Sequence, residues 1–116
     1  MNRIEAYSFG KIVINKEQFQ SDVIIYSDRV DDKWWRSEGH NLIISDLPFL
    51  ADHQPKILVI GQGKFGFMKI SQEFQNYIQE NNLDCRIAKT GKAVEIYNNL
   101  WSKGERDIIA AFHLTC

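Results

Sequence analysis

A glycine-rich segment is the first stretch of this sequence that could bind a ligand. Residues Gly61–Gly66 read G-Q-G-K-F-G and match the pattern G-x-G-x-x-G directly after an apolar run. In dinucleotide-binding folds such glycines permit a tight turn and let backbone N–H groups approach a pyrophosphate. Asp84 lies at about the distance downstream where those folds place a ribose-binding acid. The spacing alone therefore indicates a nucleotide site.

The residues around the glycines argue against a dinucleotide. Such a fingerprint opens a helix at once, whereas Phe67–Ile70 is predicted to be extended and the next helix to begin at Ser71. Asp84 falls near the start of its predicted strand, away from the carboxyl end where a ribose would lie. We interpret Gly61–Gly66 as a tight structural turn. The ligand that it suits best is a smaller anion, held by loop N–H groups and Lys64.

A second phosphate-like segment, Thr90-Gly91-Lys92, lacks the glycine and spacer that precede these residues in a phosphate-binding loop. We interpret Thr90 as the N-cap of a helix instead. Neither segment predicts a cofactor.

Large aromatic side chains occur in a polar loop at positions 34–40. Aromatic residues and arginine are favoured in interfaces. The members that predict an interaction surface for a protein partner or a second copy are Trp34, Trp35, Arg36 and His40. The alternative is that one tryptophan seals the edge of the core while Arg36 stacks over it.

The segment near the C-terminal end carries a histidine and a cysteine, His113 and Cys116. A catalytic thiolate needs a neighbouring base or positive charge. On a strand these two side chains would point to opposite faces, so pairing requires a bend after Leu114. We therefore predict no catalytic residue. The histidines and cysteines also lack paired ligand spacing, and we predict no metal site.

The elements that position these residues change character along the chain. Ile4–Phe9, Lys11–Ile14 and Val23–Tyr26 predict an antiparallel meander, with a polar turn at Asn15–Glu17 between the last two. We expect these early strands to form a separate antiparallel layer or an edge extension of the main sheet. A short helix is expected from Ser45 or Asp46 to about His53.

The second half alternates strands and helices. Ile57–Ile60 is a continuous apolar run and Asp107–Leu114 is almost wholly apolar, as in strands buried on both faces. A helix after Ser71, a strand at Leu83–Lys89 and a helix after Thr90 lie between them. This β-α-β-α-β order predicts parallel strands joined by right-handed crossovers.

Composition restricts the class of protein. With 116 residues, 44% hydrophobic, we expect one domain spanning residues 1–116. The net charge of -1 and the dispersed lysines make nucleic acid an unexpected partner. Two cysteines and no signal-like N-terminus predict a cytoplasmic protein. No apolar run is long enough for a membrane span.

The order and spacing of several short motifs resemble the adipogenesis-associated domain family, small proteins known as a domain of unknown function. The motifs are Leu58–Gly63, Tyr77-Ile78, Ile87–Thr90, Ala93-Val94, Tyr97-Asn98 and Phe112–Cys116, with the Trp35-Arg36 pair upstream. The resemblance implies a three-layer α/β fold with a central mixed sheet and a smaller β-layer from the N-terminal half. One mitochondrial relative assists respiratory complex I assembly but diverges at His113–Cys116, and a vertebrate relative is linked to fat-cell differentiation.

Two functions follow as hypotheses. The first is a non-enzymatic interaction or assembly protein that uses the loop of Trp35 and Arg36. The second is a small-molecule or anion-binding protein, and an enzyme is one form that this protein could take. Its cleft would lie near Gly61–Gly66 with Arg36 or His113, because open α/β sheets bind ligands at the carboxyl ends of their strands.

Overall fold

The computed structural model describes residues 3–116. Along this part of the chain the elements of the first half are β1 (Ile4–Ser8), β2 (Lys11–Ile14), β3 (Glu17–Phe19), β4 (Val23–Ile25), β5 (Val30–Asp31), β6 (Asn41–Leu42), η1 (Ile44–Asp46) and η2 (Pro48–Ala51). Those of the second half are β7 (Ile57–Gln62), β8 (Lys69–Ile70), α1 (Gln72–Glu80), β9 (Asp84–Ala88), α2 (Thr90–Ser102) and β10 (Ile108–His113).

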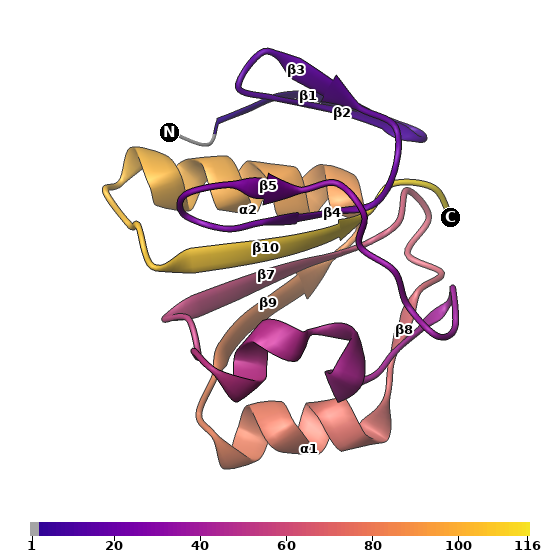
Figure 1. Ribbon diagram of the computed structural model, residues 1–116, viewed down its shortest axis with the longest axis vertical. Helices are drawn as coiled ribbons and strands as arrows, with labels where there is room; N and C mark the ends of the chain where they lie inside the picture. Colours follow the sequence, from indigo (N-terminus) through magenta and orange to yellow (C-terminus); the bar gives the residue numbers. More distant parts are fainter. Residues whose placement is uncertain (1–2) are drawn as a thin grey trace.

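A mixed sheet of strand order β5-β4-β10-β7-β9 forms the centre of the molecule (Figure 1). β7 lies parallel to both β9 and β10, whereas β4 pairs antiparallel with β10. Every residue of β10 is buried, as are Ile57–Gly61 of β7. The predicted β-α-β-α-β half and its strands buried on both faces are confirmed.

The first three strands form a separate antiparallel sheet of order β1-β2-β3. The predicted turn at Asn15–Glu17 is one residue too long, because Glu17 already pairs with Ile14 in β3. Placing Val23–Tyr26 in this meander is wrong, because β4 pairs with β10 and, with β5, extends the central sheet instead. All three residues of β4 are buried, and such a strand gains more from the central sheet than from the edge of a small one.

Two apolar cores cover the two faces of the central sheet. One lies between that sheet, α2 and the β1-β2-β3 sheet, with Tyr97 and Phe112 at its centre. The other lies beneath α1 and the two 3₁₀ turns and contains Phe74 and Met68. Figure 1 shows the β1-β2-β3 sheet and α2 on one side and α1 on the other. The predicted three-layer arrangement is confirmed.

Local signals predicted some helix boundaries better than others. Ser71 is the N-cap of α1, and its hydroxyl accepts a hydrogen bond from the N–H of Phe74. The single helix expected up to His53 is instead two 3₁₀ turns, and Leu47 between them has an irregular backbone. Pro48 begins the second turn because its fixed φ angle suits the first position of a helical turn.

Candidate functional site

The glycine segment lies at the carboxyl end of β7 and is filled by the chain itself. The N–H of Lys64 donates to the Thr115 carbonyl at 2.6 Å, and the N–H of Phe67 donates to the Cys116 carbonyl at 3.0 Å. The N–H of Gly66 donates to Gly63, which closes the turn. These backbone donors are therefore already used within the protein, as expected of a structural turn.

Gly63 is required by this close approach. Its φ angle is +96°, and a Cβ atom built there would overlap the Cys116 carbonyl group. Both a left-handed conformation and the absence of a side chain are needed. The glycine thus serves contact between two chain segments, where a dinucleotide fold would use it for contact with a pyrophosphate.

Thr90 holds the same region together from beneath. Its buried hydroxyl accepts a hydrogen bond from the N–H of Gly63 at 2.8 Å and donates to the carbonyl of His113 at 2.6 Å. The prediction of Thr90 as an N-cap is wrong, because Lys89 takes that position and offers no side-chain hydrogen bond. The hydroxyl is drawn inward by two backbone groups that burial would otherwise leave unpaired.

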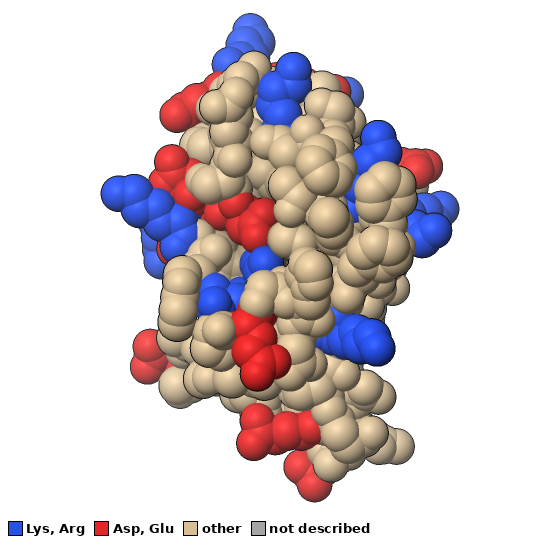
Figure 2. Space-filling model, turned by 90° about the vertical axis from the view of Figure 1, so that its right-hand side faces the viewer, with Lys and Arg blue, Asp and Glu red and all other residues tan. Residues whose placement is uncertain are grey.

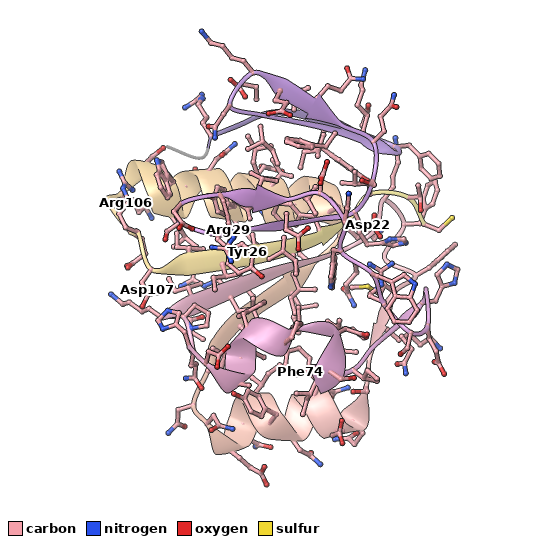
Figure 3. The ribbon with its side chains drawn as sticks, viewed as in Figure 1. Asp22, Tyr26, Arg29, Phe74, Arg106 and Asp107 are labelled. Atoms are coloured by element: carbon pink, nitrogen blue, oxygen red, sulfur yellow. The ribbon has the colours of Figure 1, made fainter. Side chains whose placement is uncertain are left out.

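A buried polar cluster, Asp22–Arg36–His113, lies beside this turn. Nδ1 of His113 is 2.8 Å from Oδ2 of Asp22 and 3.0 Å from Nη2 of Arg36. Nη1 of Arg36 forms an ion pair with the same Asp22 oxygen at 2.8 Å, although without hydrogen-bond alignment. The other Asp22 oxygen accepts from the N–H of Leu114. Figure 3 shows Asp22 at the same end of the sheet as the C-terminal end of β10.

The chemistry of this cluster is that of an oriented imidazole. Burial raises the pKa of Asp22, but hydrogen bonds from His113 and Leu114 outweigh it, so that the pKa of this carboxyl lies below its ordinary value. Nε2 of His113 and Nε of Arg36 are buried and have no hydrogen-bond partner among residues 3–116. An imidazole held by a carboxylate can transfer a proton through its other nitrogen.

The residues of the predicted interaction surface separate in the structure. Trp34 is buried, its Nε1–H donates to the Asp46 carbonyl, and Arg36 stacks on its ring. That is the alternative in which a tryptophan seals the core. Trp35, with 76% of its surface exposed, and His40 remain accessible. His40 lies near His113, with ring centroids 6.1 Å apart.

An exposed cluster that the sequence pattern did not predict lies on the glycine turn. We call Phe9, Phe65 and Phe67 the aromatic patch. Their exposed fractions are 49%, 52% and 57%, and their rings follow one another at centroid distances of 6.3 and 5.9 Å. The available signal was that all three phenylalanines stand directly beside the turn glycines Gly10 and Gly66.

A basic groove adjoins this patch at the start of α2. We call it the lysine groove. It is open, about 480 Å³ in volume, and lined by Tyr7, Ser8, Lys64, Lys89, Gly91, Lys92 and Glu95. Lysines that are dispersed in the sequence are thus brought together by the fold.

Other classes of site are not supported within residues 3–116. No group of histidine, cysteine and acidic side chains in this part of the chain could hold a metal ion. None of its helices is both long and apolar enough to cross a bilayer. The close contacts of His113 Nδ1 are with Asp22 and Arg36, which leaves Cys116 outside the cluster.

The sequence of this chain matches a known protein family. A family model described as "Protein of unknown function (DUF498/DUF598)" matches residues 4–113. The chain belongs to this family. The match includes Asp22, Arg36 and His113 of the buried cluster and all three phenylalanines of the aromatic patch, while it ends before Cys116.

Solved structures show the fold that this DUF498/DUF598 member shares. A conserved hypothetical protein from Pyrococcus horikoshii is 23% identical, with a TM-score of 0.81 over 98% of this chain and 99% of that one. A structure described as an outer membrane protein from Bartonella henselae is 19% identical, with a TM-score of 0.80 over 99% and 96%. A Bordetella pertussis protein described as an Mth938-like domain is 18% identical, with a TM-score of 0.63 over 97% and 85%.

Proposed function

We propose that this protein is a non-enzymatic interaction or assembly protein that binds a protein partner through the aromatic patch. The observation that carries the proposal is the contiguous exposure of Phe9, Phe65 and Phe67. Figure 2 views this end of the molecule and shows an uncharged area with both basic and acidic side chains around it. Burying a phenylalanine side chain contributes roughly 2 kcal/mol, so covering three of them favours association.

The rigidity of the turn supports the same conclusion. Phe65 and Phe67 flank Gly66, and the turn is fixed by the backbone hydrogen bonds of Lys64 and Phe67 to the C-terminal segment. A preorganised aromatic surface loses little conformational entropy when it binds. Trp35 lies on a different loop and offers a second, smaller surface.

The proposal is tested by quantitative capture of proteins from host-cell lysate on the immobilised chain. The double variant Phe65→Ser and Phe67→Ser should lose most of the captured partner while keeping the wild-type unfolding midpoint, since both side chains are exposed. Ile87→Ser is the matched control, because Ile87 is an exposed apolar residue of β9. Its capture should equal that of the wild type.

Two results distinguish the aromatic patch from the loop at positions 34–40 as the interface. Full capture by the double phenylalanine variant contradicts the proposal. Loss of capture in Trp35→Ala alone would move the interface to the loop at positions 34–40. Size-exclusion chromatography of wild type and double variant identifies a second copy of the chain as the partner if only the wild type dimerises.

A second candidate function is binding of a small anion or small molecule at the carboxyl end of β10. It is favoured by the buried Nε2 of His113 and Nε of Arg36, which lack partners within residues 3–116. Lys64, within the glycine turn, is an exposed cation that could also contact the anion. A thermal-shift series with phosphate, nucleotides and carboxylates tests it, with His113→Gln and Lys64→Ala as variants. Stabilisation of the wild type that both variants lose would support this function, and no stabilisation would exclude it.

We also propose a more specific family relationship and a location for this protein. The motif resemblance to the adipogenesis-associated domain family supports a role in assembly of other proteins, as in its complex I assembly relative. The balanced charge and two free cysteines support a cytoplasmic location.

A further inference from the structure

We infer that the partner presents an acidic segment with an aromatic or aliphatic side chain, and that its carboxylates occupy the lysine groove while the apolar side chain covers the aromatic patch. This inference rests on the proposed function and adds the chemistry of the partner. It follows from the adjacency of two surfaces of different character.

The groove and the patch are one continuous surface. Lys64 lines the groove and precedes Phe65 of the patch. Ser8 lines the groove and precedes Phe9, whose ring lies 6.3 Å from that of Phe65. At Gly66 a Cβ atom would lie 3.2 Å from Cγ of Lys89, so the Lys89 stem covers the turn between Phe65 and Phe67.

The charge of the groove selects an anion. The lining contains three lysines, Lys64, Lys89 and Lys92, but one carboxylate, Glu95. None of these lysines forms an ion pair with another described residue, whereas Lys56 pairs with Glu105 elsewhere. The first turn of α2 contains no acidic residue, so its positive dipole end adds to the same field.

The shape of the surface favours a peptide over the other anionic partners. An open groove of about 480 Å³ with an aromatic rim accommodates side chains that project from an extended segment. A membrane surface would call for a convex basic face, and the chain as a whole carries a net charge of -1. Nucleic acid would require phosphate contacts along a longer basic track.

The test is an NMR titration of the ¹⁵N-labelled chain at low salt. The probe is the peptide Glu-Glu-Phe-Glu repeated three times. Saturable shifts at the amides of Lys64, Phe67 and Gly91 are expected. Replacing the probe's phenylalanines by alanine, or its glutamates by lysine, should each weaken binding, because one of the two surfaces then loses its complement. Absence of saturable shifts at these amides overturns the inference.

Charge reversal gives the decisive variant. Lys64→Glu combined with Lys89→Glu should weaken probe binding roughly tenfold, since each change removes an attraction and adds a repulsion. Lys103→Glu together with Lys56→Glu has the same net charge and should leave binding unchanged. An equal loss in the control pair, or tighter binding of oligothymidine or phosphatidylserine vesicles than of the peptide, overturns the assignment to an acidic peptide.

The two proposals fail in distinguishable ways. If the phenylalanine variant retains lysate capture, the patch is not an interface and the proposed function fails. If that variant loses capture while the lysine reversal retains it, the protein does bind a partner through the patch, but the partner is not acidic.

Discussion

Oδ2 of Asp22 lies 2.8 Å from Nδ1 of His113, although the two residues are 91 positions apart. Asp22 immediately precedes β4 and His113 ends β10, so the antiparallel pairing of these strands brings them together. Arg36 reaches the pair from the loop between β5 and β6. The cluster therefore fastens that loop to the central strand.

The Asp22 carboxylate should stabilise the fold in a pH-dependent way. Asp22→Asn leaves the buried Arg36 without its counter-charge and should cost about 3 kcal/mol in the free energy of unfolding at pH 7. Because the folded-state pKa lies below the ordinary value of 3.8, the charged group's contribution is full above that pH. It is lost as the pH falls through the lower folded-state pKa.

Urea unfolding between neutral and strongly acidic pH measures this effect. Asp28→Asn is the control, because Asp28 and its partner Arg29 are largely exposed and should contribute less than about 0.5 kcal/mol. Parallel stability–pH curves for wild type and Asp22→Asn below pH 4 would contradict the prediction.

The Thr90 hydroxyl should contribute more to the free energy of unfolding than a helix N-cap does. Thr90→Val leaves the Gly63 N–H and the His113 carbonyl without their shared partner, at a cost of about 3 kcal/mol. Thr90→Ser keeps the hydroxyl and should recover most of that loss. Chemical denaturation of the three proteins checks this, and equal losses for valine and serine would show that the methyl group matters instead.

Gly63 and Gly39 should respond very differently to alanine. Gly63→Ala forces a Cβ atom into the Cys116 carbonyl at a positive φ angle and should cost about 3 kcal/mol or more. At Gly39 no atom lies within 4 Å of the position that an alanine methyl group would take, so this site should tolerate alanine. Thermal unfolding compares the two. A drop in stability at Gly39 as large as at Gly63 would count against the role of close contact.

The thiol of Cys85 should react slowly with alkylating reagents. Burial, aided by Asp84, raises its pKa to about 12, so roughly one molecule in ten thousand carries the thiolate at pH 8. Iodoacetamide labelling followed by peptide mass spectrometry should find Cys85 unmodified under conditions that label free cysteine. Rapid labelling of Cys85 in the folded protein would refute this prediction, and the urea-unfolded chain provides the positive control.

Elements with a local signal were predictable. Ile57–Ile60 is apolar throughout and Asp107–Leu114 almost so, and this pattern alone indicates central parallel strands. Ser71 precedes an amphipathic run and caps it as expected. β4 was assigned to the wrong sheet because three apolar residues do not specify which partner strand buries them.

The site was less predictable because its contacts are long-range. No spacing rule connects Asp22 to His113. Thr90 resembles an N-cap in the sequence, and only the fold shows that its hydroxyl donates to the carbonyl of His113. The glycine pattern reflects a contact with Thr115 and Cys116 in place of a ligand. The aromatic patch combines Phe9 with Phe65 and Phe67, which meet only after the β1–β2 turn docks on the glycine turn.

The position of β10 between β4 and β7 has a consequence for synthesis on the ribosome. Neither neighbour can complete its backbone hydrogen bonds until Ile108–His113 has left the exit tunnel. Until then the emerging chain holds two unpaired strand edges, a state that invites pairing with other chains. Folding should begin late and depend on distant contacts, so it should be slower than that of a helical protein of the same length.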